Sequence, residues 1–325
     1  MNMGHAPHFI QAQEVGPHMT WSEAIKALRT GHLRARATQS DVFLGPAQGS
    51  LLSRAAHIEG LGFGVKSVTV FGDNPRAGLP TVQGAMQVFE PEHGRLVAII
   101  DSRLITEWKT AADSVLGAQL LARADSETLL IVGAGAVARS LVHAYAAGLP
   151  SLRKIGVWAR RPEQARALVA EVSAQNPPPG VALSAVLDLA TGAAQADIIA
   201  SATMAREPIL LGEWVKAGTH VDLIGAFKAD MREADDALIS AGRLFVDSRE
   251  STMHHIGELC IPLAQGVIEE ADVLGDLYDL CAEERRGGQA RCSRQDITIF
   301  KNGGGAHLDL MMAGYIAEVA SHRSA

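Results

Sequence analysis

A glycine turn between an apolar run and a helical pattern is the clearest chemical feature of the sequence. Residues 129–150 read LLIVGAGAVARSLVHAYAAGLP, in which Gly133, Gly135 and Ala138 form the spacing G-x-G-x-x-A. The first glycine allows a tight turn, the second lets backbone approach a pyrophosphate, and the small third residue lets the helix pack closely on the strand. The pattern predicts a dinucleotide site. The alternative is a small-residue corner that binds no ligand.

The residues after the glycine turn indicate which nucleotide would bind. The helix expected to begin at Ala136 and Val137 would direct free amide groups and a positive dipole end toward phosphates. The next predicted strand ends 27 residues past the first glycine, where NAD-selective sites carry an acidic residue for the ribose hydroxyls. Here that end reads VWARRPE, so Arg160 and Arg161 precede the first carboxylate, Glu163. Because guanidinium groups suit a 2′-phosphate, the sequence favours NADPH over NADH; the alternative for Arg161 is a solvated helix-start residue.

Two later strand ends complete the expected cofactor site. Ser201 and Thr203 lie in the SAT stretch that ends the fourth strand of the predicted sheet, where the chain would pass the nicotinamide end. Gly225 follows the next strand, in the turn IGAFK. Small and hydroxyl residues also occur at strand ends simply to fit a turn, so these three are candidate contacts.

A second group of candidates consists of cations in otherwise apolar or small-residue segments, namely Arg54, Lys66 and Lys109. Lys66 is the only charge in GFGVKSVTVF, and strand alternation would place Val65 and Ser67 on the opposite face. Lys109 begins KTAADS near the start of a predicted helix, where a cation opposes the dipole unless an anion lies before it. A substrate carboxylate would serve, since each charge-assisted hydrogen bond contributes roughly 1.5–3 kcal/mol. The alternative for a lone strand lysine is an edge or surface position.

Composition excludes several classes of protein. The chain has 325 residues, 47% of them hydrophobic, and a net charge of −7, which argues against a nucleic-acid-binding protein. Its three cysteines form no C-x-x-C pair and leave an odd thiol, which is typical of a reducing cytoplasm. No secretory signal is evident, and no apolar run approaches the roughly 20 residues needed to cross a bilayer. We therefore expect a cytoplasmic protein without a membrane or nucleic-acid partner.

The order of expected elements predicts an α/β fold in two domains. Residues 1–19 are expected to form an irregular lead-in, and residues 41–101 four or five mainly antiparallel strands joined by short links. From about residue 127, strands alternate with helices long enough for parallel crossovers, which predicts a doubly wound sheet. We expect a Rossmann domain at 121–303 inserted in an α+β substrate-binding domain formed by 1–120 and 304–325.

Several segments together resemble the ornithine cyclodeaminase/μ-crystallin family. The resemblance covers the chain from about residue 40 to its end and implies a Rossmann domain, a nicotinamide cofactor, amino-acid or imine substrates, and a homodimer built through the first domain. The segments that carry it are GVKSVTVFGDNPRAGLPTVQG, LITEWKTAADS, VGAGAVARS, ASATMAREPIL, GAFKADMREADD, VDSRES and IFKNGGGAHLDLMMA.

The resemblance also assigns roles to residues of the first domain. Lys66 matches the family's strand lysine, which binds the substrate carboxylate, and Thr81 matches the threonine beside the substrate. Lys109 stands where the family usually has the arginine of RTAA, so an ammonium replaces a guanidinium group that can bind a carboxylate through two hydrogen bonds. Arg54 is a conjectural source of the missing guanidinium group. Gly304, in the last motif, is also assigned to the substrate site.

One departure from the family bears on the reaction. Cyclodeaminases carry an acid in a GGD turn, whereas this chain has Phe227 there, and an apolar ring cannot transfer a proton. We therefore expect a reductase of cyclic imines, acting on Δ1-pyrroline-2-carboxylate, with Δ1-piperideine-2-carboxylate as a second candidate. The imine nitrogen needs a proton, which could come from Lys66, from solvent or through a water held by Thr81.

Other readings of the sequence stay open at this point. They are an amino-acid dehydrogenase of the alanine dehydrogenase type, an ornithine cyclodeaminase, and a protein that binds NADPH and a small ligand without turnover. A metal site is not expected, because His254, His255 and Cys260 offer donors without a recognised spacing.

Overall fold

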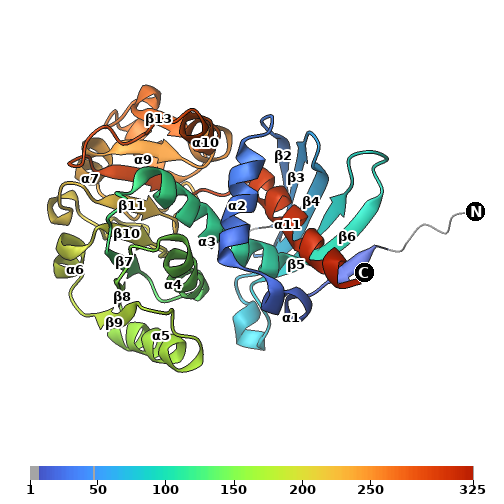
Figure 1. The fold of residues 1–325 in the computed structure, drawn as a ribbon, viewed down its shortest axis with the longest axis horizontal. Coiled ribbons are helices and arrows are strands. Elements are labelled where there is room, and N and C mark those ends of the chain that lie inside the picture. Colours follow the sequence, from blue (N-terminus) through green and yellow to red (C-terminus); the bar gives the residue numbers. More distant parts are fainter. Residues whose placement is uncertain (1–6, 47, 325) are drawn as a thin grey trace, which may run out of the picture. The chain divides into compact units, whose positions relative to one another are not determined.

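The chain divides into two compact units in the computed structural model, which describes residues 7–46 and 48–324. Unit 1 consists of Met1–Lys109 and Gly305–Ala325, as far as these are described, and unit 2 of Thr110–Gly304. The first division falls within helix α3 (Ser102–Leu121), so one continuous helix leads from the first unit into the second (Figure 1).

Unit 1 contains a six-stranded sheet in the order β1-β6-β5-β4-β3-β2. The neighbours from β2 to β6 are antiparallel, as the short links predicted, whereas β1 pairs with β6 in parallel. Residues 1–6 of the predicted irregular lead-in lie outside the described residues. For residues 7–19 the prediction was wrong, because residues 8–10 pair with β6, which is distant in the sequence. The strands are β1 (His8–Ile10), β2 (Thr38–Leu44), β3 (Ser50–Ile58), β4 (Gly62–Val70), β5 (Val82–Phe89) and β6 (Leu96–Asp101).

One face of this sheet is covered by a long helix. The final helix α11 (Ala306–Ser324) packs on β2, β3, β4 and β5, and α2 (Trp21–His32) packs on α11. The short helix α1 (Ala12–Val15) also contacts α11. Figure 1 shows α11, in red, lying across the blue strands although the two are far apart in the sequence. On this face Ala56, Lys66, Val68, Met86 and Val88 are buried, whereas Phe63, on the opposite face of β4, is exposed.

Unit 2 contains an eight-stranded sheet in the order β13-β12-β14-β11-β10-β7-β8-β9, and every pair is parallel. The strand order reverses between β7 and β10, which is the switch point where doubly wound sheets bind nucleotides. The prediction of a Rossmann sheet is confirmed, although β13 was not expected. The strands are β7 (Thr128–Val132), β8 (Lys154–Trp158), β9 (Ala182–Val186), β10 (Ile198–Ser201), β11 (His220–Leu223), β12 (Arg243–Val246), β13 (Val273–Asp276) and β14 (Thr298–Lys301).

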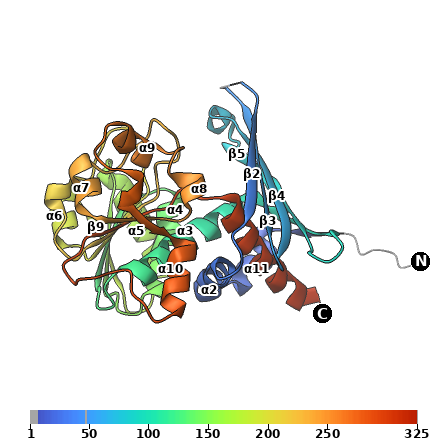
Figure 2. The ribbon, with the colours of Figure 1, turned by 90° about the horizontal axis from the view of Figure 1, so that it is seen from above.

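Helices lie on both faces of this parallel sheet (Figure 2). They bury a continuous apolar core that includes Leu130, Val132, Ile199 and Val221. In addition to the second half of α3, the helices are α4 (Ala136–Gly148), α5 (Pro162–Gln175), α6 (Leu189–Gln195), α7 (Asp236–Ala241), α8 (Arg249–Thr252), α9 (Gly257–Ala264) and α10 (Leu277–Arg285).

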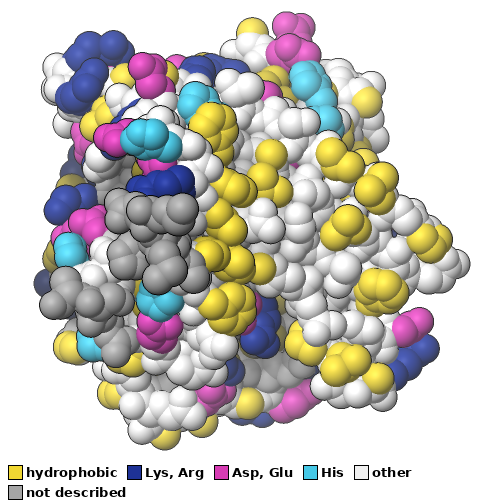
Figure 3. All heavy atoms as spheres, turned by 90° about the vertical axis from the view of Figure 1, so that its right-hand side faces the viewer, with side chains coloured by type: hydrophobic (Ala, Val, Ile, Leu, Met, Phe, Trp, Pro, Cys, Tyr) yellow, Lys and Arg dark blue, Asp and Glu magenta, His cyan; other side chains and the backbone are white. Residues whose placement is uncertain are grey.

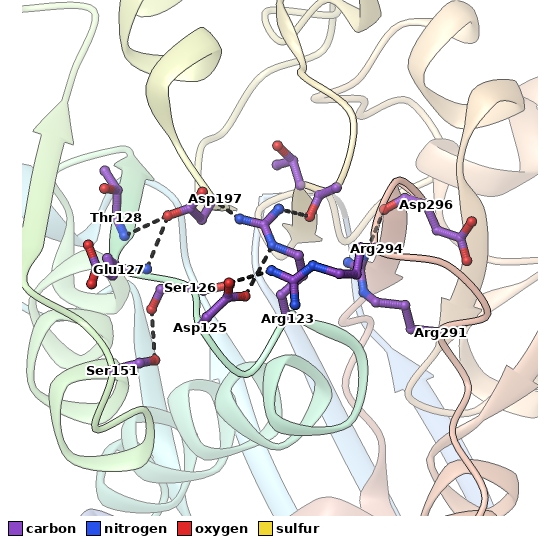
Figure 4. A network of polar contacts seen from close by, with 12 residues as sticks. Arg123, Asp125, Ser126, Glu127, Thr128, Ser151, Asp197, Arg291, Arg294 and Asp296 are labelled. Carbon is purple, nitrogen blue, oxygen red and sulfur yellow. Dashed lines mark hydrogen bonds and ion pairs between the residues drawn. The ribbon is translucent and has the colours of Figure 1, made fainter.

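Ion pairs fix the edge of this sheet at which the strands begin (Figure 4). Arg123 donates to Gly218 O at 2.7 Å and to Asp197 at 2.8 Å, and Asp197 also accepts from the amides of Glu127 and Thr128. Arg291, on a later segment, donates to backbone carbonyls and to a threonine hydroxyl. These guanidinium groups are already bound to partners within the chain. The candidate ligand site therefore lies at the opposite edge of the sheet, where the strands end.

No helix in the described part of the chain combines the length and apolar character needed to cross a membrane. The three cysteines, which are all described, form no disulfide.

Candidate functional site

Lys66 lies on the covered face of the unit 1 sheet. Strand β4 pairs with β3 on one side and β5 on the other, so Lys66 occupies a central strand and not an edge. Its side chain shares the buried face with Gly64 and Val68, while Val65 and Ser67 face the other way, as strand alternation predicted. Only 7% of Lys66 is exposed, so the alternative of a surface lysine is excluded.

The ammonium of Lys66 forms a buried ion pair with helix α11. Its Nζ lies 2.6 Å from Oδ2 of Asp309, and the side chains are 8% and 1% exposed. The pKa of Lys66 is lowered, mainly by burial. The negative charge of Asp309 raises this pKa, whereas repulsion from Lys109 and Arg54 lowers it further. Burial raises the pKa of Asp309, but Lys66 and then Lys109 outweigh burial, so that this carboxyl stays ionised.

Lys109 is a second buried cation of unit 1, and it lies well inside a helix. Helix α3 begins at Ser102, so the prediction that Lys109 lies near a helix start was wrong, and so was the dipole argument based on it. Lys109 is 7% exposed and has no hydrogen-bond or ion-pair partner among the described residues. The charge of Lys109 also lowers the pKa of Asp309, so it acts on the same carboxylate that pairs with Lys66. A cation without a direct ion pair suits an anion supplied from outside the chain.

Arg54 completes the cation cluster but is already paired. It lies opposite Lys66 in the β3–β4 register, and its Nε and one Nη contact Oδ2 of Asp41 at 2.9 and 2.8 Å. Arg54 and Lys66 are therefore each paired with one carboxylate, Asp41 and Asp309 respectively, whereas Lys109 has no ion pair with a described residue. This arrangement suits a bound carboxylate at Lys109.

A histidine beside this cluster does not add to its charge. Burial, with Lys109 as the next contribution, lowers the pKa of His307 to about 3. The imidazole is therefore neutral near pH 7, and its Nδ1 lies 3.3 Å from Oε1 of Gln39. His307 is therefore a neutral, buried residue beside the cations.

Thr81 is not brought next to Lys66. It is half-buried at the start of β5, and its carbonyl accepts a hydrogen bond from Phe71 N at 2.9 Å. Lys66 pairs instead with Met86, five residues further along the same strand. The role of Thr81 beside the substrate stays a prediction.

In unit 2, the glycine turn has the geometry that a dinucleotide requires. Gly133 adopts φ +125°, and a Cβ atom there would lie 2.6 Å from the carbonyl oxygen of Ala202, so only glycine fits. A Cβ atom at Gly135 would meet nothing within 4 Å, which leaves open space in front of the turn. Ala138 is fully buried against the sheet.

The amino end of helix α4 faces that open space. No side chain caps it, and the residues at its start, Ala136 and Val137, are exposed and half-buried respectively. Free amides and the positive dipole end are what a pyrophosphate binds. These residues thus fit a dinucleotide.

The two predicted arginines lie after β8, next to β7. Arg160 is exposed in the turn, and Arg161 is the exposed N-cap residue of α5, whose side chain makes no capping hydrogen bond. Neither side chain has a polar partner among the described residues. Two unpaired guanidinium groups at a helix amino end are therefore available to a phosphate.

The candidate residues after β10 and β11 converge on a buried carboxylate. Glu233 accepts hydrogen bonds from Ser201 Oγ, from Thr203 N and Oγ1, each at 2.7 Å, and from Gly225 N at 2.6 Å. The Ser201 hydroxyl is fully buried and points inward, so its role is to support the strand end.

The remaining two candidates also lie after strand ends of unit 2. Phe227 is 51% exposed, with the Lys228 ammonium 5.5 Å from its ring centre, so an apolar side chain occupies the turn. Gly304 has φ +75°, and its amide donates to Asp247. The contact of Phe227 and Gly304 with the substrate stays a prediction.

Sequence reasoning missed the buried charges beneath these turns. Lys301 is fully buried and donates to Leu223 O at 2.8 Å and Asn302 O at 3.0 Å. Glu258, also fully buried, accepts from the amides of Glu233 and Ala234. The same sequence pattern that indicated Lys66 could have indicated Lys301, because Lys301 is the only charge between the apolar stretch ITIF and NGGG.

Potential metal ligands lie outside these two groups. Among the described residues, the one cluster of three suitable donors is Glu90, Glu92 and His93, at an exposed turn. His254 and His255 are exposed, and Cys260 donates to Ile256 O. Within the described part of the chain, none of these residues forms a hydrogen bond or ion pair with the cation cluster or the glycine turn.

Comparisons with known proteins agree on one family. A sequence profile of the ornithine cyclodeaminase/mu-crystallin family matches residues 7–324. The chain is 59% identical over 314 residues to Delta(1)-pyrroline-2-carboxylate reductase of Paracoccus denitrificans, an alignment that covers 97% of each chain.

Two solved structures are similar over nearly the whole length. The first is Thermococcus litoralis Delta(1)-pyrroline-2-carboxylate reductase in complex with NADH and L-proline, with a TM-score of 0.89, 26% identity and 98% coverage of each chain. The second is an archaeal alanine dehydrogenase dimer with bound NAD, with a TM-score of 0.87, 27% identity and coverage of 98% of this chain and 97% of the other.

Proposed function

The chain belongs to the ornithine cyclodeaminase/mu-crystallin family, and on this premise we propose that it is an NAD(P)H-dependent reductase of cyclic ketimines. Its substrate is Δ1-pyrroline-2-carboxylate and its product is L-proline. The structural observation that carries the proposal is the cation cluster of unit 1, in which Lys109 forms no hydrogen bond or ion pair with any described residue. The near-full-length similarity to a reductase of this imine supports the choice of substrate.

The residues of unit 1 bind and polarise the substrate in this proposal. Lys109 and Lys66 hold the carboxylate, and Asp309 fixes the position of the Lys66 ammonium. A bound NAD(P)H would supply the hydride for the imine carbon, and the imine nitrogen would take up a proton. Burial lowers the pKa of Lys66, which makes it a better proton donor than an exposed lysine, so we favour it over solvent or a water at Thr81.

The residue at the family's acidic position favours reduction over cyclodeamination. Phe227 can pack against ring methylenes but cannot accept or donate a proton. The alternative of an alanine dehydrogenase shares the fold but requires ammonia and a keto acid as substrates. A cyclic imine already contains the nitrogen, so omission of ammonia separates the two activities.

We propose NADPH as the preferred cofactor. Arg160 and Arg161 stand where NAD-selective sites have an acidic residue, and both guanidinium groups are exposed and unpaired among the described residues. The solved Thermococcus litoralis reductase contains NADH. Both nucleotides therefore belong in the assay.

The open face of the unit 1 sheet supports a homodimer, in keeping with the family. Hydrophobic side chains lie in several groups on the side of the molecule seen in Figure 3. By strand alternation, five large ones point away from α11 and are 38% to 58% exposed: Phe9, Val42, Leu44, Phe63 and Val97. Such an apolar face favours association. Sedimentation of the purified chain should give twice its monomer mass; a monomer at micromolar concentration would contradict this proposal.

A cytoplasmic location is part of the same proposal. The three cysteines are free, and Cys292 is exposed, which is typical of a reducing compartment.

The reaction can be tested directly with the purified protein. NADPH or NADH is mixed with the five-membered or the six-membered imine, without ammonia, and nicotinamide absorbance is followed. We expect oxidation of the nucleotide and formation of L-proline from the five-membered imine, and no proline from ornithine with NAD. Turnover of pyruvate with ammonia but not of either imine would overturn the proposal, and so would nucleotide binding without any turnover.

A further inference from the structure

Glu233 is a fully buried carboxylate that joins the turns after two neighbouring strands. Its Oε1 accepts three hydrogen bonds from Ser201 and Thr203 at the end of β10, and its Oε2 accepts the amide of Gly225 after β11. Three of these four donors belong to Thr203 and Gly225. Thr203 lies beside the glycine turn, because a Cβ atom at Gly133 would lie 3.6 Å from its Cγ2. A single side chain thus sets the spacing of the two turns.

The turns themselves leave no room for another arrangement. A Cβ atom at Gly225 would lie 2.0 Å from the carbonyl oxygen of Thr203, so the two segments are in contact. The turn after β7 is also close to the β10 turn, because a Cβ atom at Gly133 would lie 2.6 Å from Ala202 O. Displacement of either later turn would therefore change the position of residues that line the nucleotide site.

Glu233 is held from behind by other buried charges. Its own amide donates to Glu258 at 2.8 Å, and its carbonyl accepts from Ile209 and Leu210, both at 2.9 Å. The buried ammonium of Lys301 supplies the opposite charge, and it donates to Leu223 O at the end of β11. The position of the Glu233 carboxylate in the core is therefore fixed by these neighbours.

The segments that Glu233 joins belong to one half of a dinucleotide site. In a Rossmann sheet, each mononucleotide half of the cofactor binds to one half of the sheet, and the glycine turn lies in the first. Strands β10 and β11 follow the switch point and form the second half, which takes the nicotinamide mononucleotide.

We propose that Glu233 is a positioning residue for the nicotinamide half of the nucleotide site, which it shapes through Thr203 and Gly225. The inference rests on the proposed function only in taking NAD(P)H as the nucleotide. Glu233 makes no contact with the adenosine half in this proposal, so its removal should weaken the binding of one half of the cofactor and spare the other.

Glu233→Gln tests the proposal because glutamine has the same shape but one acceptor oxygen. Its NH2 group must face either Gly225 N or the three donors from Ser201 and Thr203, so at least one buried donor loses its acceptor. We expect the Kd for NADH, measured by titration calorimetry without imine, to rise about tenfold. The Kd for ADP-ribose, which lacks the nicotinamide, should stay within about twofold of the wild-type value.

Asp197→Asn is the matched control. Asp197 also accepts two backbone amides and pairs with an arginine, but it lies at the opposite edge of the same sheet. This variant should lower thermal stability and leave both Kd values unchanged. Glu233→Asp keeps the charge but moves the carboxylate away from its donors, so it should also weaken NADH binding selectively. This variant replaces Glu233→Gln in the test if Glu233→Gln does not fold.

The outcomes separate this inference from the proposed reaction. Equal weakening of NADH and ADP-ribose in the Glu233 variants, or no weakening of NADH, would overturn the role of Glu233. A wild-type protein that binds NADH and reduces no imine would overturn the reaction, while the comparison of the two ligands would still decide the role of Glu233.

Discussion

Replacement of Lys66 by methionine should lower kcat/KM for Δ1-pyrroline-2-carboxylate by at least about a hundredfold. Methionine preserves the length of the side chain but removes the ammonium that faces the substrate carboxylate. A charge-assisted hydrogen bond contributes roughly 1.5–3 kcal/mol, and loss of the favoured proton donor adds to that cost. Steady-state kinetics with NADPH at saturating concentration measure the effect, and both KM and kcat should change.

A stability measurement must accompany these kinetics, because Lys66 is paired with Asp309 in the core of unit 1. Removal of one partner from a buried ion pair costs about 3–5 kcal/mol of folding free energy. The double variant Lys66→Met/Asp309→Asn removes both charges and should recover most of the thermal stability without recovering activity. Wild-type kinetics in Lys66→Met would refute the assignment of Lys66, and recovery of activity in the double variant would reduce its role to folding.

The features that could be predicted from the sequence are those that depend on local pattern. A lone charge in an apolar strand indicated Lys66, because strand alternation forces such a residue to one face, and that face proved to be buried. The glycine spacing indicated the turn at Gly133, whose positive φ and close backbone neighbour demand glycine. Alternating strands and helices likewise predicted the parallel sheet.

The features that escaped prediction depend on partners far away in the sequence. Strand β1 is three residues long and exists because β6 offers it hydrogen bonds across about ninety positions. Lys109 was predicted to lie near a helix start, whereas the helix begins at Ser102, a full turn and more before it. Such boundaries are set by tertiary packing and not by propensity.

Buried polar networks were the largest omission. Glu233 lies in the polar stretch MREADD, which has the composition of an exposed loop, yet its side chain is fully buried among four donors. Burial of a carboxylate requires partners that only the folded chain assembles, here from β10, β11 and the segment before α7. The functional contribution we propose for Glu233 therefore could not be read from its neighbours in sequence.

Replacement of both Arg160 and Arg161 by alanine should lower the preference for NADPH over NADH by about a hundredfold, and each single change by about tenfold. A guanidinium group that binds the 2′-phosphate contributes only when that phosphate is present, so kcat/KM for NADH should stay near its wild-type value. Neither side chain caps α5 or has a described polar partner, so the fold should be unaffected. The measurement is kcat/KM for each nucleotide at a saturating concentration of the imine.

Arg166→Ala provides the control for the loss of positive charge on the same helix. Arg166 is exposed on α5 but lies more than a turn beyond the amino end, where a phosphate would bind. This variant should keep the wild-type nucleotide preference. Two results would show that the arginines do not recognise the 2′-phosphate. One is a wild type that uses NADH as efficiently as NADPH, and the other is a double variant in which kcat/KM falls equally for both nucleotides. The exposed pair would then be solvated residues of a turn, and the choice of nucleotide would depend on other parts of unit 2.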